Sequence, residues 1–440
     1  MKHDNLIKRD HQHIWHPCSQ MKDYEVFKPL HIVSAKGCYL ELKDGKRVID
    51  AISSWWCKSL GHQHPRLKQA LLKQMEKFEH VILANTTHEG IVELSLKLSR
   101  LIPSLNKIFY ASDGSSAIEI ALKMSLHARQ LQGEKRTLFV ALENGYHGET
   151  VGALSVSDLG LYRAPYTPLL FESHFIASLP YVFSTEDPLW KDCSSHWMEI
   201  EKKLIPLAHQ ITAIIVEPIV QGAGGMKIYS QDFLRRLWKF TKQNHIHLIA
   251  DEMMTGLGRT GRILACHYAE IEPDFLGLSK GLTGGFLPFS AILTTQAIYD
   301  LFYDDYQTGK SFLHSHTYSG NALAAAVALE VLNVIEEENI CKQAEEVGKV
   351  MLQGMREIAE KTGRLENIRG IGAMVAADLV TKEKTKRIGF EVYQKATELG
   401  ALLRPLGNTI YWLPPLNISM ETLAELKEIT KQAIVSVSYS

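Results

Sequence analysis

The sequence lacks the features that point to a membrane, a secreted or a nucleic-acid-binding protein. No uninterrupted apolar run approaches the ~18 residues of a membrane span, and the opening MKHDNLIKRDHQHIW is too polar for a secretion signal. Six cysteines stand far apart without a C-x-x-C pair, which is typical of reduced thiols. With 48 basic and 49 acidic residues, no excess charge attracts nucleic acid or anionic lipid. We expect a cytoplasmic protein without either partner.

Internal repeats, low-complexity tracts and Pro/Ser-rich linkers are also absent, although 440 residues are about three times an ordinary domain length. Four His-x-His pairs occur, but no cysteine or second pair completes any of them at a usual ligand spacing, so we predict no metal site. The pairs are His11/His13, His62/His64, His245/His247 and His314/His316.

The apolar pattern divides the chain into three parts. Residues 1–60 read as short strands with a hairpin turn at 43–46. In residues 61–325, helical segments alternate with short apolar runs, which is typical of a mostly parallel sheet covered on both faces. Long helical patterns and two short strands fill residues 326–440. We therefore predict an α/β fold, with a large domain (61–325) and a smaller α+β domain built from both chain ends (1–60 and 326–440).

Lys280 stands alone in an apolar stretch. It is the only charged residue between Phe275 and Tyr299, within FLGLSKGLTGGFLPFSAIL. A lone buried ammonium is costly. Either Lys280 turns outward at this glycine-rich loop, as most lysines do, or its charge is consumed by something bound there.

The stretch ASDGSSAIEIALKM follows a predicted strand and opens a helix. Gly114 lets a ligand approach the backbone, and the first N–H groups of a helix form a seat for phosphate. Ser116 and Glu119 fit a capping box. On this stretch alone, a plain helix cap is the simpler interpretation.

Two further groups follow predicted strands. Asp251 ends the run IHLIAD, at the sheet edge where ligands bind, and could pair with a protonated ring nitrogen. Tyr146 follows the run TLFVAL, and its ring could stack on a planar ligand. A surface carboxylate and a packed tyrosine are the alternatives. Together with Lys280, which could form a Schiff base, and the phosphate seat, they describe a site for pyridoxal phosphate.

The chain resembles the class III pyridoxal-phosphate-dependent aminotransferases along nearly its whole length. The pattern that carries the resemblance is, in order, Gly114-Ser115, Tyr146-His147-Gly148, Glu217-Pro218, Asp251-Glu252, GLGRTG (256–261), Ser279-Lys280-Gly281 and TYSGN (317–321). A sharper resemblance, to the members that serve biotin synthesis, rests on HIWHP (13–17), SSWW (53–56), EPIVQGAGGM (217–226) and RPLGNTIYWLPP (404–415).

The resemblance implies the type I aminotransferase fold and a set of roles at the cofactor. Lys280 would be linked to the cofactor and transfer protons, while Asp251 would keep the ring nitrogen protonated. Tyr146 would cover one face of the ring, and Met253 would touch the other. The implied cofactor-binding residues are Gly114, Ser115, Tyr146, Asp251, Lys280 and Thr317, the last from the partner subunit of a homodimer.

The sharper resemblance also implies the substrates. S-adenosyl-L-methionine would donate an amino group to 8-amino-7-oxononanoate, whose long apolar chain ends in a carboxylate that Arg404 would clamp. Trp55 and Trp56 would wall this chain, although tryptophan pairs more often belong to a core. The implied substrate-binding residues are Cys18, Trp55, Tyr146, Lys280, Arg404 and Tyr411.

Two departures from the family pattern lie near the expected pocket. Cys18 stands where an aromatic residue, often tyrosine, is usual, and His316 stands where many close relatives have proline. Because both bear on the substrate rather than on the cofactor, lysine stays open as an alternative amino donor.

Three other functions compete with this interpretation. GLGRTG matches the G-x-G-x-x-G fingerprint of nicotinamide dehydrogenases, but DEMMT separates it from the strand and no acid ends a strand ~20 residues on. Another class III enzyme, of the ornithine, γ-aminobutyrate or other ω-amino type, is a second alternative. A non-catalytic protein that binds pyridoxal phosphate is a third, against which the intact Lys280 and Asp251 argue.

Overall fold

The central sheet of the computed structural model, which describes residues 2–381 and 386–438, has seven strands. In spatial order they are β4 (Lys107–Ala111), β13 (Ser290–Thr294), β12 (Phe275–Leu278), β11 (His247–Asp251), β8 (Ile211–Val216), β5 (Leu138–Leu142) and β6 (Ser173–Ile176). Only β13 runs antiparallel to its neighbours. Every residue of β8, β11, β12 and β13 is buried, because helices cover both faces. The predicted α/β fold is confirmed.

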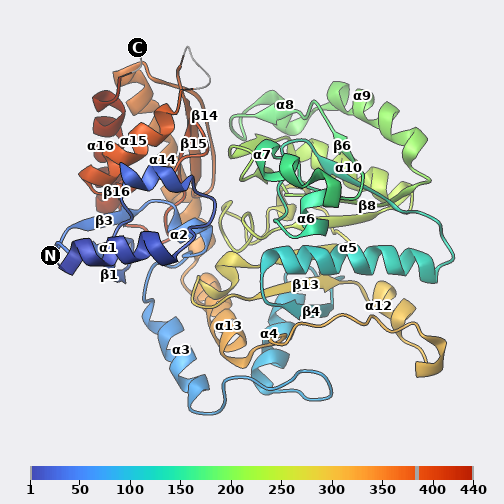
Figure 1. Ribbon diagram of the computed structural model, residues 1–440. Coiled ribbons are helices and arrows are strands. Elements are labelled where there is room, and N and C mark those ends of the chain that lie inside the picture. The colour runs from blue at the N-terminus through green and yellow to red at the C-terminus, as the bar shows by residue number, and fades with distance from the viewer. Residues whose placement is uncertain (1, 382–385, 439–440) are drawn as a thin grey trace.

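Helices surround this sheet (Figure 1). They are α3 (Pro65–Met75), α4 (Glu89–Ser99), α5 (Gly114–Leu131), α6 (Val151–Ser155), α7 (Gly160–Arg163), α8 (Pro188–Lys191), α9 (Ser194–Leu204), α10 (Gln231–Gln243), α11 (Cys266–Ala269), α12 (Gln296–Phe302) and α13 (Ala322–Glu337). The 3₁₀ turns are η1 (Met21–Glu25), η2 (Ala164–Leu169), η3 (Ile205–Leu207), η4 (Lys280–Thr283) and η5 (Tyr306–Thr308).

Segments from both ends of the chain lie together beside the large sheet (Figure 1). One small sheet has the order β1 (Ile32–Lys36), β2 (Tyr39–Leu42), β3 (Arg47–Asp50) and β16 (Ala401–Leu402), and β16 pairs in parallel with β3. Another contains β14 (Leu365–Ile371), β15 (Met374–Leu379) and β17 (Thr409–Trp412). A further small sheet comes from the middle of the chain and contains β7 (Tyr181–Val182), β10 (Lys227–Tyr229) and β9 (Val220–Gln221). The accompanying helices are α1 (Lys2–His13), α2 (Ser53–Trp56), α14 (Ile340–Thr362), α15 (Ile388–Leu399) and α16 (Met420–Ser436).

The predicted strands and long C-terminal helices form at the expected places. The described part of residues 326–440 contains four strands, β14 to β17, rather than the two that were predicted. The helix α1 was also not predicted. Its sequence KHDNLIKRDHQH is polar almost throughout, with Ile7 as a buried anchor. The main sequence signal for a helix is a regular spacing of apolar residues along one face, and this segment has too few apolar residues to show it. Across residues 2–381 and 386–438, no helix has both the length and the apolar character needed to span a membrane.

His247, the first residue of β11, gives the fold a testable pH dependence. Its ring is buried, its Nδ1 lies 2.8 Å from Ser125 Oγ, and burial lowers its pKa to about 3. In the unfolded chain the pKa of this histidine is about 6.5, so below that pH the unfolded chain binds a proton that the folded chain does not bind. The free energy of unfolding therefore falls as the pH drops from about 6.5 toward 3. His247→Gln removes this loss. We expect the stability advantage of wild type over the variant to shrink by about 2 kcal/mol between pH 7.5 and pH 5.

Urea unfolding at the two pH values measures this difference. His209→Gln, at an exposed histidine, serves as the control and should give the same difference at both pH values. An advantage of wild type over His247→Gln that is independent of pH would contradict the assignment of a neutral, buried ring.

Candidate active site

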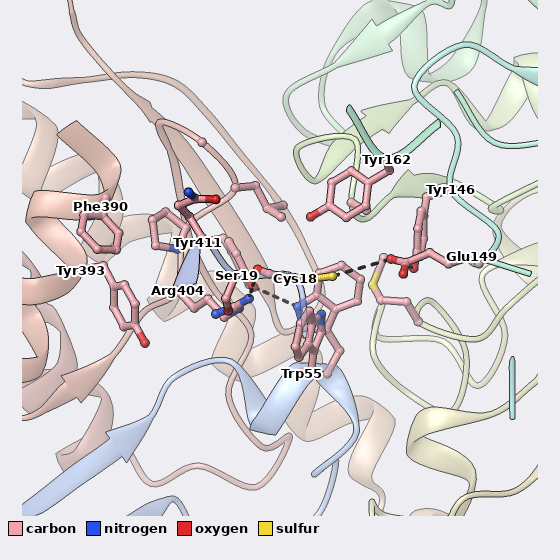
Figure 2. A pocket seen from close by; sticks show the side chains of 18 of the residues that line it. Cys18, Ser19, Trp55, Tyr146, Glu149, Tyr162, Phe390, Tyr393, Arg404 and Tyr411 are labelled. Atoms are coloured by element: carbon pink, nitrogen blue, oxygen red, sulfur yellow. Dashed lines mark hydrogen bonds between the residues drawn. The ribbon is translucent and has the colours of Figure 1, made fainter. Parts of the chain in front are cut away.

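A cavity of about 590 Å³ lies at the carboxyl ends of β5, β11 and β12, beside the segments from the two chain ends. It collects nearly all the residues predicted from the sequence. Those that line it are Cys18, Trp55, Trp56, Gly114, Ser115, Tyr146, Asp251, Met253, Lys280, Arg404 and Tyr411. Figure 2 shows several of these side chains around it. Thr317 does not line the cavity; its side chain is exposed in the segment before α13.

Lys280 begins η4, with Ser279 between it and the end of β12, and has a left-handed φ of 45°. Its amine lies 5.1 Å from the ring centre of Trp56 and makes no hydrogen bond or ion pair within residues 2–381 and 386–438. Burial lowers its pKa, although Asp251 and Glu217 act in the opposite direction. Such an amine is more readily neutral, and therefore nucleophilic and basic, than a surface lysine.

Asp251 is the last residue of β11, and its carboxylate is held from two sides. One oxygen accepts a hydrogen bond from Met253 N at 3.1 Å, and the other lies 2.8 Å from His147 Nδ1. The His147 ring is buried, and its Nε2 has no partner in the described residues. The pair fixes the direction in which the carboxylate faces the cavity.

Glu217 is a buried carboxylate beneath Tyr146. It accepts hydrogen bonds from Tyr146 N at 3.0 Å and from Gly222 N at 2.9 Å. Burial raises its pKa to about 7. These two bonds tie the Tyr146 backbone to a second loop of the site.

Glu149 lines the cavity and was missed by sequence reasoning. Tyr146 Oη donates to Glu149 Oε1 at 3.0 Å, and Cys18 Sγ lies 3.7 Å from the same oxygen (Figure 2). Burial, followed by the charge of Glu149, raises the pKa of Cys18. The sequence feature that could have identified Glu149 as a residue of the site is its position directly after Tyr146-His147-Gly148.

The start of α5 corrects the predicted capping box. Asp113 is the N-cap, and its carboxylate accepts hydrogen bonds from Ser116 N at 2.9 Å and Ser116 Oγ at 2.7 Å. Glu119 instead accepts from Gly152 N and Ala153 N, at the start of α6. The N–H groups of Gly114 and Ser115 stand in the first turn, where a helix offers them no acceptor.

Arg404 lies at the other end of the cavity, over Trp55. Its Cζ is 4.6 Å from the ring centre of Trp55, and its Nη2 donates to Cys18 O at 2.9 Å (Figure 2). No ion pair of Arg404 occurs in the described part of the chain, so the guanidinium charge is available to a ligand. Tyr411 Oη accepts from Trp56 Nε1 at 3.1 Å nearby.

These residues fit pyridoxal phosphate. The open end of α5 suits the phosphate, and the oriented Asp251 suits a protonated ring nitrogen. Tyr146 offers an aromatic face. The amine of Lys280, buried without a counter-ion in hydrogen-bonding range among the described residues, is the group that an aldehyde would consume.

Comparison with known proteins places the chain in a family. The family model described as aminotransferase class III matches residues 20–434. The chain belongs to the class III aminotransferases.

Relatives of this aminotransferase match along almost the whole length. The adenosylmethionine-8-amino-7-oxononanoate aminotransferase of Helicobacter pylori is 41% identical over 95% of each chain, and that of Aquifex aeolicus is 36% identical over 98% of this chain and 97% of its own. The crystal structure of the enzyme with this name from Methanocaldococcus jannaschii has a TM-score of 0.91 and 33% identity, covering 99% of this chain and 100% of that one. A PLP-bound amine transaminase from an uncultivated Pseudomonas species has a TM-score of 0.89 and 29% identity, over 97% and 99%.

The GLGRTG stretch of this aminotransferase does not form a nucleotide fingerprint. Gly258 and Gly261 occupy left-handed turns, and the following helix, Cys266–Ala269, has only four residues. Arg259 is buried there and donates to the carbonyl oxygens of Ala373 and Pro414. The stretch therefore packs the loop after β11 against the segment around β17, and the dehydrogenase alternative is wrong.

Proposed function

We propose that the protein uses pyridoxal phosphate to transfer the amino group of S-adenosyl-L-methionine to 8-amino-7-oxononanoate in biotin biosynthesis, in the cytoplasm. The observation that carries the proposal is that one cavity holds the amine of Lys280 and the guanidinium of Arg404, neither of which forms an ion pair among the described residues. An acceptor with a ketone at one end and a carboxylate at the other needs this combination. The names of the relatives support the choice of substrates.

The side chains divide the work between cofactor and substrate. Bound pyridoxal phosphate supplies an aldehyde that condenses with amines and a ring that withdraws electrons. Lys280 Nζ takes the proton from the carbon that bears the donor amine. Asp251, oriented by His147, holds a proton on the ring nitrogen, and Tyr146 covers the ring. Gly114 and Ser115 bind the phosphate.

Arg404 binds the acceptor carboxylate through paired N–H donors, which fixes the chain of the acceptor against Trp55. Trp56 and Tyr411 continue this wall toward Lys280. Cys18, whose carbonyl already accepts from Arg404, closes the same side.

We propose a homodimer in which the partner subunit's Thr317 completes the phosphate site. The exposure of Thr317 on this chain, outside its own cavity, supports this arrangement. Exposed apolar side chains of the same region, Tyr306, Leu313 and Tyr318, give it a surface that a second copy could cover. We also keep the division into a large domain (61–325) and a small domain (1–60 with 326–440) as a proposal.

A panel of amino donors tests the function. Purified protein loaded with pyridoxal phosphate is mixed in turn with S-adenosyl-L-methionine, lysine, ornithine and γ-aminobutyrate, and the single-turnover change in cofactor absorbance is recorded. We expect S-adenosyl-L-methionine to react fastest. A response to lysine alone would reassign the donor, and a response to ornithine or γ-aminobutyrate alone would refute the proposed reaction.

The role of Arg404 predicts a change in the affinity for the acceptor. Arg404→Ala removes a charge-assisted contact with the carboxylate, so KM for 8-amino-7-oxononanoate should rise roughly 10- to 100-fold. Steady-state kinetics at saturating donor measures this. Arg387→Ala is a matched control, because Arg387 lines the same cavity but is paired with Asp23 at 2.8 Å. A larger effect at Arg387 than at Arg404 would contradict the assignment.

A further inference from the structure

The turn that carries the two tryptophans has an unusual backbone. All four residues of α2 (Ser53–Trp56) have positive φ, between 45° and 73°, so the turn is left-handed. None of them is glycine, and contact between the Cβ and the following carbonyl disfavours this conformation for other residues. Such a backbone persists where surrounding contacts hold it, typically at functional sites.

Asp50 supplies the first of these contacts. Its side chain is fully buried. One carboxylate oxygen accepts from Ser54 N at 2.8 Å, and the other accepts from Ser54 Oγ at 2.7 Å. The carboxylate of Asp50 therefore binds both the backbone and the side chain of Ser54, the second residue of the turn.

His62 holds Asp50 in turn. Its Nε2 lies 2.8 Å from the Asp50 oxygen that accepts from the Ser54 hydroxyl. The backbone of His62 is fixed by two hydrogen bonds with Gly37, His62 N to Gly37 O at 2.8 Å and Gly37 N to His62 O at 3.0 Å. A buried carboxylate needs such partners to stay charged.

A second anchor ties the turn to the segment after β17. Ser53 Oγ donates to Leu413 O at 2.8 Å, and Leu413 N donates to Ala51 O at 2.8 Å. Because Tyr411 and Leu413 belong to one extended segment, the turn is held in register with the wall of the cavity.

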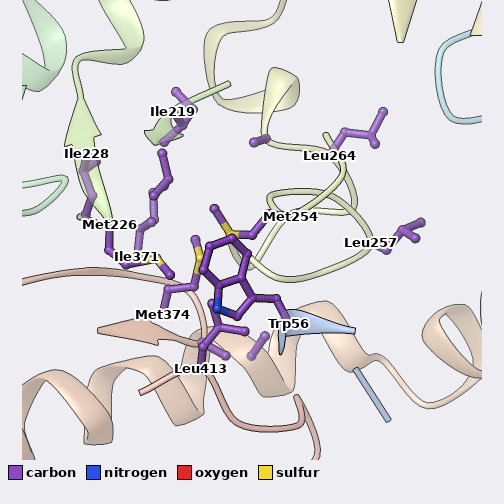
Figure 3. Close-up of a cluster of buried hydrophobic side chains, with 14 of the residues drawn as sticks. Trp56, Ile219, Met226, Ile228, Met254, Leu257, Leu264, Ile371, Met374 and Leu413 are labelled. Carbon is purple, nitrogen blue, oxygen red and sulfur yellow. The ribbon is translucent and has the colours of Figure 1, made fainter. Parts of the chain in front are cut away.

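The turn determines where both indole rings lie. Trp55 lies under Arg404 and remains 42% exposed toward the cavity. Trp56 is buried against Met254 and Leu413 (Figure 3) and donates to Tyr411. The two rings therefore lie at opposite ends of the cavity, Trp55 beside Arg404 and Trp56 beside Lys280.

We propose that Asp50 and His62 are positioning residues for the substrate. Neither lines the cavity. They hold α2 left-handed, and this sets the spacing between the carboxylate end at Arg404 and the amine end at Lys280. The inference rests on the proposed function, because it takes the acceptor to be a long chain that spans both ends.

A glycine rescue separates this role from general stabilisation. Asp50→Asn removes the charge that grips the turn, and KM for 8-amino-7-oxononanoate should rise about tenfold, with a smaller change in kcat. In Asp50→Asn/Ser54→Gly, residue 54 adopts positive φ without a Cβ penalty and keeps its N–H. We expect the double variant to recover most of the lost affinity, and near-ultraviolet circular dichroism of the tryptophans to return toward wild type.

Two controls complete the design. Asp44→Asn is the matched substitution, because Asp44 also accepts from a turn N–H, that of Lys46, but lies in an exposed hairpin. It should leave KM and the spectrum unchanged. If Asp50→Asn does not fold, Ser54→Ala is compared with Ser54→Gly. The alanine variant keeps the Cβ and loses the hydroxyl, so it should show the larger rise in KM.

Each outcome decides the inference. A thermal midpoint that falls in Asp50→Asn while KM and the spectrum stay at wild-type values would leave Asp50 a structural residue only. A double variant no better than Asp50→Asn, or Ser54→Ala no worse than Ser54→Gly, would also overturn the proposal. Failure of the proposed function shows separately, as a wild type that does not turn over this substrate pair. In that case the circular dichroism comparison still tests the turn.

Discussion

Lys280→Ala is expected to lower kcat by about 10⁴-fold, because the variant loses the amine that moves the substrate proton. The amine is suited to this task by its position at the end of β12 and by the burial that lowers its pKa. Steady-state kinetics measures the loss. In wild type, borohydride reduction should fix the cofactor on the tryptic peptide that contains Lys280, and in the variant no peptide should carry it.

Lys58→Ala is the matched control for this experiment. Lys58 is also partly buried, with a pKa lowered by burial, and its amine lies over the ring of Phe286 at 4.7 Å. It does not line the cavity. The control should keep near-normal activity and the modified Lys280 peptide. Comparable losses in both variants would show that the effect comes from disturbed packing rather than from chemistry.

Asp251→Asn is expected to lower kcat by roughly 10²- to 10³-fold, the cost of removing one oriented electrostatic contact from an active site. An amide of the same shape cannot hold a proton on the ring nitrogen by charge, and it also weakens the bond to His147. The absorbance spectrum of the bound cofactor should shift as well, which provides a readout independent of turnover.

Asp274→Asn controls for the loss of a carboxylate near the same strand. Asp274 accepts from Leu248 N at the opposite end of β11 and pairs with Lys242. The variant should lose some stability and little activity. If Asp251→Asn keeps wild-type kcat and spectrum, the assignment of Asp251 to the ring nitrogen is wrong.

The central sheet and the gathering of Asp251, Tyr146 and Lys280 could be predicted because they depend on local signals. Mostly apolar runs such as Ile211–Val216 become covered strands whatever packs on them. A residue that ends such a strand, or follows it within a few positions, lies near the carboxyl edge of the sheet, so three positions along the sequence converge on one site.

The substrate end of the cavity depends partly on contacts between segments that are distant in the sequence. SSWW itself gives no sign of a left-handed turn. Ser53–Trp56 is held by Asp50, which lies four residues before Ser54, and by Leu413 and His62 from other segments. Sequence reasoning could name Trp55 and Trp56 only through a family resemblance. It could not say that one ring would back Arg404 and the other Lys280.

The error at α5 has a similar cause. Asp113 and Ser116 both suit an N-cap, and they stand only three positions apart, so sequence alone does not choose between them. Glu119 looked like the partner in a capping box, but it accepts from the backbone of α6 instead. The spacing of Glu119 predicted a hydrogen bond within its own helix, but its side chain forms a tertiary contact with α6 instead.

The pairing of β3 with β16 has a consequence for how the chain is made on the ribosome. β3 ends at Asp50, and its neighbour begins at Ala401, so roughly 350 residues must be translated before that edge is covered. At about 5–20 residues per second, the nascent chain carries an open strand edge for roughly 20 to 70 s. A prematurely terminated chain that stops short of residue 401 would keep that edge open permanently, and we expect such products to be captured by chaperones or to aggregate.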